Sequence, residues 1–348
     1  MARTPSVTAL VTGVGAPVGV GIIKALRASS LAVRIIGVDC EPLAQGLFRV
    51  DRPYVVPSAR PDPRTYLNAL INICQQEQVD ILFSGWEGEL PLLANHKAEI
   101  EAQTEAILPF APDATLKALD KWLTFKVLQA FKVPVPDTVC PLDREALAAF
   151  RDTHAYPYII KPRRGSGGRG LVLVQSDEEL DFFSRYITDP IVQEQLLPDD
   201  QEYTVGTFLQ ADQTPVGAFS MKRSLSGGLS YRMESNHNPD ACAIALQAVA
   251  AIGAIGIANV QMRWTPQGFK VFEINPRCSS TTCVRANFGF NEPELAIRHF
   301  VLQESPPPPT TRTGICLRFW EELYLPLEAK DAAQQHQYPQ QGRILSQF

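Results

Sequence analysis

The chain has 348 residues, which is long enough for two or three domains with their own hydrophobic cores. Its formal charge of -5 argues against a protein that coats nucleic acid or an anionic membrane surface, because both would repel an acidic chain. No apolar run reaches membrane-spanning length, and the first residues lead into a strand instead of a signal peptide. Seven scattered cysteines without a CxxC pair favour reduced thiols, so we expect a cytoplasmic protein without a zinc site.

The first part of the chain alternates between strand-like and helix-like patterns. An apolar strand is predicted over Val7–Thr12, followed by a glycine-rich loop over Gly13–Gly19 and a helix over Val20–Ala28. The next predicted elements are a strand over Val33–Asp39, helical spacing around Tyr66–Cys74, a strand over Val79–Phe83 and a helix over Glu89–Glu101. This alternation predicts a parallel α/β domain, which we place at residues 1–112.

Two polar segments of this domain lie where α/β sheets commonly bind ligands, after the carboxyl ends of strands. The loop Gly13–Gly19 has the spacing GxGxxxG, and Asp39 follows at about the distance of a ribose-binding acid, so an NAD-dependent oxidoreductase is one alternative. Glu87 and Glu89 follow the strand that ends at Phe83. Either glutamate would contact a substrate amine or cap the next helix, and the residues alone leave both readings open.

The middle and C-terminal parts mix helices with strands outside the alternating pattern. A helix is predicted from Asp113, a plausible N-cap, to Phe131, where it stops before a Val-Pro-Val-Pro run. Strands over Tyr158–Lys161, Leu171–Gln175 and Ile191–Leu197, with a helix over Asp177–Tyr186, predict a small domain at residues 113–190 and the start of another at 191–325. That last domain reads as two strands, a long helix, a hairpin, helices to Gln303 and a strand over Gly314–Phe319. Residues 326–348 are predicted to be a loosely ordered tail.

A glycine-rich segment joins the strands on either side of residues 162–170. Its four glycines free the backbone to fold N–H groups around anionic oxygens, while Lys161 and three arginines supply positive charge. The segment lacks the GxxxxGK[ST] pattern and leads into a strand, so it is not a P-loop. We interpret it as a mobile phosphate-binding flap, because a plain hairpin turn would require none of these cations.

The hairpin around Pro266-Gln267-Gly268 gathers oxygen ligands. A three-residue loop with glycine in the left-handed position is a common hairpin connection. The pairs it predicts are Thr265 with Phe269, Gln261 with Glu273, and Asn259 with Asn275. Strand alternation then places Gln261, Glu273 and Asn275 on one face, as Mg²⁺ requires of its oxygen donors. The alternative is a sheet with a merely polar outer face.

Taken in order, these motifs resemble the ATP-grasp superfamily, over residues 1 to about 320. The resemblance is nearest to the carbamoyl-phosphate-synthase large-subunit-like branch, which includes the pyrrolysine-pathway amino-acid ligase. It implies a Rossmann-like N-terminal domain that does not bind NAD, a small central lid and a C-terminal α+β domain. The motifs that carry it are Asp120-Lys121, Val133-Pro-Val-Pro136, Tyr156-Pro-Tyr-Ile-Ile-Lys161 with the flap, Val192-Gln-Glu194-Gln-Leu-Leu, Glu202-Tyr-Thr-Val and Gln261 with Glu273-Ile-Asn275-Pro-Arg277.

The resemblance implies a nucleotide site between the lid and the last domain. Lys121 and Lys161 would meet the ATP phosphates from exposed positions in a cleft, because a buried lysine without phosphate is costly. Glu194 would accept a hydrogen bond from the adenine amino group, and Glu202 would hold the ribose hydroxyls. The remaining residues implied to contact the nucleotide are Ser166, Gly167, Gly168, Gln195 and Leu197.

The resemblance also implies the metal ligands and the groups that assist the chemistry. Gln261, Glu273 and Asn275 would hold Mg²⁺, with Mn²⁺ as the alternative ion. Arg277 would stabilise charge on the transferring phosphoryl group. Lys222 is the second expected catalytic cation, because it precedes a glycine pair in a segment that would face the cleft.

The implied reaction joins a carboxylic acid to an amine through an acyl phosphate, with release of ADP and phosphate. The acid and the amine would be small molecules, and nucleic acid and membrane partners are not expected. The sequence leaves the oligomeric state open, and a homodimer is the commonest default for such folds. The alternatives are a carboxylase or carbamoyl-phosphate-type synthetase, a non-catalytic nucleotide-binding protein, and the oxidoreductase.

Overall fold

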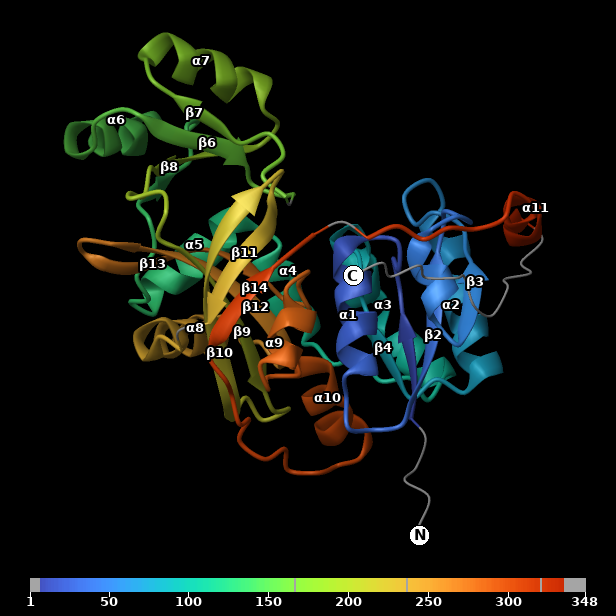
Figure 1. The fold of residues 1–348 in the computed structure, drawn as a ribbon. Coiled ribbons are helices and arrows are strands. Elements are labelled where there is room, and N and C mark those ends of the chain that lie inside the picture. The colour runs from blue at the N-terminus through green and yellow to red at the C-terminus, as the bar shows by residue number, and fades with distance from the viewer. Residues whose placement is uncertain (1–6, 166, 236, 320, 335–348) are drawn as a thin grey trace.

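The computed structural model describes residues 7–165, 167–235, 237–319 and 321–334, and it contains three sheets (Figure 1). The N-terminal sheet has the order β3-β2-β1-β4, and all its strands are parallel. Within these residues, no helix is both long and apolar enough to cross a membrane. The elements of the N-terminal domain are β1 (Val7–Val11), α1 (Pro17–Arg27), β2 (Val33–Asp39), η1 (Gln45–Arg49), β3 (Arg52–Val55), α2 (Pro63–Glu77), β4 (Ile81–Phe83), η2 (Glu87–Glu89) and α3 (Leu90–Gln103).

The lid is a four-stranded antiparallel sheet with the order β5-β8-β6-β7, which stands apart from the other two sheets (Figure 1). Its two helices cover a small core of their own, around Phe150, Tyr158, Leu180 and Val192. A small separate core is typical of regions with lower local stability. The elements of the lid are β5 (Thr138–Val139), α6 (Arg144–Thr153), β6 (Tyr158–Pro162), β7 (Val172–Val174), α7 (Asp177–Tyr186) and β8 (Pro190–Glu194).

The largest sheet has six strands in the order β13-β12-β9-β10-β11-β14. Helices α4, α5 and α8 pack on one of its faces, and α9 and α10 on the other. Its elements are α4 (Pro112–Ala118), α5 (Lys121–Ala130), β9 (Glu202–Leu209), β10 (Pro215–Ser226), β11 (Leu229–Ser235), α8 (Pro239–Ala251), β12 (Gly256–Thr265), β13 (Gly268–Asn275), α9 (Thr282–Asn287), α10 (Glu292–Ala296), the π-helix η3 (Ile297–Val301) and β14 (Gly314–Leu317).

One apolar core joins the N-terminal domain to this sheet. Ile22 and Leu26 of α1 lie in the same cluster of buried side chains as Phe219 of β10 and Phe290, which precedes α10. Helix α1 also packs directly against α9 and α10. Because burial of apolar surface is the dominant favourable term in folding, this shared core fixes the N-terminal domain against the sheet that carries the hairpin.

The predicted helix over Asp113–Phe131 is two helices. Asp113 does not cap the first, whose N-cap is Ala111. The break falls at Asp120, whose carboxylate accepts hydrogen bonds from the N–H groups of Trp122 and Leu123 and so caps α5. The same carboxylate accepts from Arg163 at 2.5 Å, which ties the start of α5 to the base of the flap.

The predicted domain borders remain a proposal. Two segments near these borders pack with a different domain from the one that the prediction gave them. β8 begins at Pro190 and pairs with β5 and β6 of the lid, whereas α4 and α5 pack against the hairpin sheet. In the tail, α11 spans Glu328–Gln334, and residues 335–348 lie outside the described part of the chain.

Candidate nucleotide and metal site

A cleft of about 390 Å³ lies between the lid sheet and the six-stranded sheet. Nine of the predicted nucleotide and metal residues line it: Lys121, Lys161, Gly167, Gly168, Glu194, Gln195, Glu202, Gln261 and Glu273. Leu197 lies outside its lining, and Leu196 takes that place. Ser166 lies outside the described residues. The cleft is large enough for a nucleotide-sized ligand.

Two lysines and one carboxylate meet at one end of this cleft. The Nζ atom of Lys121 lies 3.6 Å from Oε1 of Glu273 and also donates to the carbonyl of Gly165 in the flap. Lys161 is buried rather than exposed, which corrects the prediction, and its Nζ donates to Oε1 of Gln193 at 2.9 Å. Burial lowers the pKa of Lys161 to about 8. The nearby Lys121 lowers this pKa further, whereas the carboxylate of Glu273 raises it. A phosphate group would supply the negative charge that this end lacks, so the residues fit a nucleotide triphosphate.

The hairpin confirms the two outer pairs and corrects the inner one. Gln261 pairs with Glu273 and Asn259 with Asn275, as predicted. The turn is shorter than expected, however, because Thr265 pairs with Gly268 rather than with Phe269. Gly268 has a φ of +104°, which favours glycine.

A β-bulge at Phe272 restores the register that the shorter turn would have shifted. Met262 pairs with Val271, and the next residue, Gln261, pairs with Glu273, so β13 has one residue more than β12 in this interval. Glu273 and Phe272 both line the cleft as a result. Without the bulge, Glu273 would face the opposite side of the sheet, since a one-residue slip exchanges the two faces.

Two arginines that were not among the predicted site residues connect the middle of the cleft. Arg223 donates to Oε1 of Glu202 at 2.9 Å through Nε and to Oε1 of Gln261 at 2.7 Å through Nη2. Arg263 donates to the other oxygen of Glu202 at 2.7 Å. Glu202 is only 7% exposed, so it is not a solvated glutamate on an open strand face.

The expectation for Lys222 is wrong in its placement. Lys222 pairs across the sheet with Tyr203, which belongs to the core beneath α8, so it shares the face away from the cleft. Its Nζ lies 4.0 Å from the exposed Asp200. Arg223, the next residue, faces the cleft in its place. The sequence shows two adjacent cations, but not which of them points toward the cleft.

Asn275 and Arg277 lie beside the cleft and connect it to the N-terminal domain. Arg277 donates through Nη2 to Oδ1 of Asn275 at 2.9 Å and forms an ion pair with Glu87. Glu87 therefore meets a protein cation. Glu89 is buried and accepts from three hydroxyl groups, including that of Ser84 at 2.6 Å, and burial raises its pKa. Neither glutamate caps a helix with its side chain.

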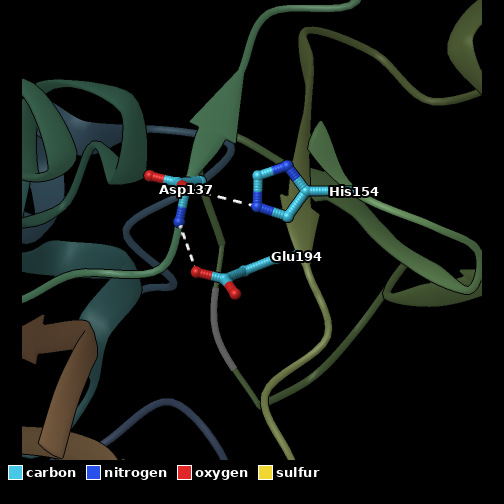
Figure 2. A group of neighbouring side chains, drawn as sticks. All are labelled: Asp137, His154 and Glu194. Atoms are coloured by element: carbon cyan, nitrogen blue, oxygen red, sulfur yellow. Dashed lines mark hydrogen bonds and ion pairs between the residues drawn. The ribbon is translucent and has the colours of Figure 1, made fainter. Parts of the chain in front are cut away.

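At the other end of the cleft, Glu194 lies in a polar cluster with Asp137 and His154 (Figure 2). Its Oε1 accepts from the N–H of Asp137 at 2.8 Å, and Nε2 of His154 lies 3.2 Å from Oδ2 of Asp137. The ligand atoms of the three residues lie within 4.8 Å of one another, a metal-like spacing that the sequence did not reveal. Lys270, however, donates to the same Oε1 at 2.5 Å and balances its charge. We therefore interpret the cluster as a contact at the base of the lid.

Asp39, the candidate ribose-binding acid of the N-terminal domain, already has backbone partners. The Asp39 carboxylate accepts from the N–H groups of Gly15, at 2.8 Å, and Glu41, at 3.0 Å. The helix η1 lies against the glycine loop, since a Cβ on Gly46 would come within 2.1 Å of the carbonyl oxygen of Val14. The ribose-binding role of Asp39 is thus replaced by a structural one.

Comparisons with known proteins agree with this geometry. Residues 10–108 match the model of the PylC-like N-terminal domain, and residues 118–281 match the model of the ATP-grasp domain. Residues 118–281 are an ATP-grasp domain. These matches give no support to the NAD alternative, and the predicted ATP-grasp fold is confirmed.

The relatives of this ATP-grasp protein include longer enzymes. It is 24% identical over 287 residues to the carbamoyl phosphate synthase large chain of Methanosphaerula palustris, covering 74% of this chain and 26% of that protein. The chain thus spans about a quarter of the length of the curated relatives that it matches first.

Solved structures share its fold at low sequence identity. The N5-carboxyaminoimidazole synthetase of Staphylococcus aureus, complexed with ADP, has a TM-score of 0.70 at 16% identity and covers 91% of this chain and 84% of that one. The L-amino acid ligase of Bacillus licheniformis has a TM-score of 0.63 at 16% identity and covers 86% of this chain and 75% of that one.

Proposed function

We propose that this ATP-grasp protein is an ATP-dependent ligase that joins a carboxylic acid to an amine and releases ADP and phosphate. The observation that carries the proposal is the convergence of Lys121, Lys161 and Glu273 at one end of a nucleotide-sized cleft. Two ammonium groups beside one carboxylate match a triphosphate held together with a divalent cation.

In the first step, an oxygen of the substrate carboxylate attacks the γ-phosphorus of ATP. The bond from that phosphorus to the β–γ bridging oxygen breaks, and ADP leaves. Lys121 and Lys161 would hold the phosphate oxygens, while Arg277, already oriented by Asn275 and Glu87, would face the charge that develops during the transfer. These residues position and stabilise charge, so no nucleophilic side chain is required.

In the second step, the amine nitrogen attacks the acyl carbon, phosphate leaves, and the nitrogen loses a proton. Gln261, Glu273 and Asn275 would hold Mg²⁺, which neutralises phosphate charge when bound. Glu202, with Arg223 and Arg263, would hold the ribose, and Glu194 with Gln195 would meet the adenine. The flap would cover the acyl phosphate and exclude water.

A second candidate within the same chemistry is a carboxylase or carbamoyl-phosphate-type synthetase, in which bicarbonate is the acid. The sequence likeness to a carbamoyl phosphate synthase large chain and the fold likeness to a carboxyaminoimidazole synthetase favour it. A screen for phosphate release with Mg·ATP separates the two candidates. Amino acids, dipeptides and small acids are offered in pairs without bicarbonate, and then each amine is offered with bicarbonate alone.

Release that requires an organic acid would support the ligase, and release that requires only bicarbonate would support the carboxylase. Failure of every combination, in a protein that binds Mg·ATP, would leave a non-catalytic nucleotide-binding protein. The complete set of Gln261, Glu273, Asn275 and Arg277 argues against that third alternative.

A further inference from the structure

A second cavity, of about 530 Å³, lies in the N-terminal domain. It is formed at the carboxyl ends of β1 and β2 and by the residues that follow β4, where parallel sheets bind ligands. Asp39 and Trp86 are among the residues that line it. The nucleotide proposal makes no use of this cavity, although its volume is typical of small-molecule sites.

Two arginines without acidic partners line this cavity. The guanidinium of Arg60 lies 5.3 Å from the ring centroid of Trp86, and Arg169 reaches the cavity from the flap. Across the described residues, neither arginine has a carboxylate within 4.0 Å, in contrast to Arg223, Arg263 and Arg277 in and beside the cleft. Unpaired guanidinium groups in a concave site suit a carboxylate or a phosphate, which they bind through paired N–H donors.

Arg169 lines both cavities. It belongs to the flap, together with Gly167 and Gly168, so movement of the flap over a nucleotide would also move a cation at the edge of the second cavity. Trp86 also lines the second cavity, and its neighbour Glu87 forms an ion pair with Arg277 beside the metal hairpin. A ligand in the second cavity would therefore lie next to the phosphate-transfer site.

Carboxylates also line this cavity, which restricts the chemistry of its ligand. Asp39, Glu41 and the buried Glu89 all face it. Arginines together with carboxylates match a molecule that carries both an anionic and an ammonium group better than a simple anion, because each charge then finds a partner.

We propose that Arg60 and Arg169 together hold the carboxylate of an amino-acid substrate in the N-terminal cavity, so that flap closure over ATP completes the site for the second substrate. This inference rests on the proposed ligase function, for which it supplies a location and two specificity-determining residues. The two arginines come from different domains, so the site is complete only when the flap is closed.

Alkylation of Cys40 tests the site without turnover. Cys40 is exposed and lines the cavity, and burial together with Asp39 raises the pKa of its thiol, so the reaction with iodoacetamide is followed at mildly alkaline pH by peptide mass spectrometry. The full chain is incubated with Mg²⁺ and a non-hydrolysable ATP analogue. L-alanine, L-lysine, L-glutamate, butylamine and inorganic phosphate are then added one at a time.

We expect at least one of the amino acids to slow Cys40 alkylation, and butylamine to have no effect. Arg60→Gln and Arg169→Gln should each raise the amino-acid concentration needed for half-protection by about tenfold, the effect of losing a charge-assisted hydrogen bond. Arg64→Gln is the matched control, because Arg64 lies on α2, is exposed and pairs with Glu99 outside the cavity. Its protection should equal that of the unmodified chain, and thermal melting confirms that all three variants are folded.

Equal protection in Arg60→Gln, Arg169→Gln and Arg64→Gln would overturn the inference, and so would protection by phosphate but by no amino acid. The outcome of this protection experiment can be told apart from the outcome of the ADP-release assay that tests the ligase proposal. Arginine-dependent protection without any ADP release would leave the site in place and reject the ligase, whereas turnover with arginine-independent protection would do the reverse.

Discussion

The Nζ atom of Lys121 lies 3.6 Å from Oε1 of Glu273, although the two residues are far apart in the chain and belong to different elements. Lys121 begins α5 directly after its cap, Asp120, and Glu273 reaches the cleft because a β-bulge precedes it. The same carboxylate also stabilises the charged form of the buried Lys161. Glu273 is therefore the group through which the two phosphate-binding lysines and the metal hairpin are coupled.

Glu273→Gln should abolish ADP release with little effect on folding. The amide keeps the size of the side chain but removes the charge that attracts a divalent cation, so we expect kcat to fall by about 100-fold or more. A coupled ADP-release assay measures this, at several Mg²⁺ concentrations and with Mn²⁺ in its place. Glu234→Gln is the control, because Glu234 is half-exposed on β11 and pairs with Arg232 outside the cleft. Near-normal turnover in Glu273→Gln would contradict the assignment of the metal site.

Nucleotide affinity should fall as the pH rises through about 8. Burial lowers the pKa of Lys161 to about 8, so its ammonium is largely charged below that pH and largely neutral above it. Phosphate binding favours the charged form, so the Kd for Mg·ATP should be lowest below pH 8 and should rise above it. Calorimetric titrations from neutral to alkaline pH measure the effect.

Lys161→Met should bind more weakly and lose this alkaline dependence, whereas Lys126→Met, at an exposed position on α5, should keep it. The lowered pKa of Lys161 also affects the stability of the fold. The folded protein releases this proton more readily than the unfolded chain, so burial of the ammonium destabilises the free fold below pH 8, and the penalty is relieved as the pH rises above that value. A pH-independent Kd in the unmodified protein would contradict the role of Lys161.

Arg223→Gln should impair nucleotide binding more than Lys222→Gln. Arg223 holds Glu202 and Gln261 together in the cleft, and loss of its charge-assisted hydrogen bonds should lower kcat/KM for ATP by about tenfold. Lys222 faces away and lies 4.0 Å from an exposed carboxylate, so its substitution should change kcat/KM by less than about twofold. Steady-state kinetics at varied ATP compare the two neighbouring positions, and equal effects would contradict the placement of Arg223.

The alternating N-terminal domain and the metal hairpin followed from local sequence signals, whereas the ATP-grasp fold and the nucleotide residues were implied by the family resemblance. The strand over Val33–Asp39 and the helix over Asp177–Tyr186 were predicted with their observed bounds. Nine predicted site residues line one cleft, most of them at positions that the resemblance implied. The hairpin pairs of Glu273 and Asn275 also match the prediction.

What the sequence did not reveal depends on features without a local pattern. The bulge at Phe272 leaves no signal of its own, and the shorter turn cancels it, so the outer pairs were right although the inner pair was wrong. Which face of β10 each side chain points to decides between Lys222 and Arg223. Two adjacent cations in the sequence do not reveal which of them faces the cleft. The partners of Glu202 and the contact of Asp137 with His154 join segments that are distant in the chain, and the lone sequence has no signal for such contacts.

Arg285 and Glu292 form a fully buried ion pair behind the metal hairpin, with Nε and Oε1 2.6 Å apart. Arg285 also donates to Oδ1 of Asn259 at 3.2 Å, and Asn259 pairs with Asn275 across the hairpin. The other oxygen of Glu292 has no hydrogen-bond partner among the described residues, and burial raises the pKa of its carboxyl group. The pair therefore supports the hairpin from a position where an unpaired charge would be costly.

Arg285→Met should lower the free energy of unfolding by about 3–5 kcal/mol, because it leaves the Glu292 carboxylate buried without its cation. The double variant Arg285→Met with Glu292→Gln should recover a large part of that loss, since no buried charge is then left unpaired. Urea denaturation of both variants and of the single Glu292→Gln variant completes a double-mutant cycle. Arg312→Met is a surface control, because Arg312 donates to the carbonyl of Asn287 from an exposed position. If the double variant were no more stable than Arg285→Met, the shape of the arginine rather than the balance of charge would support the hairpin.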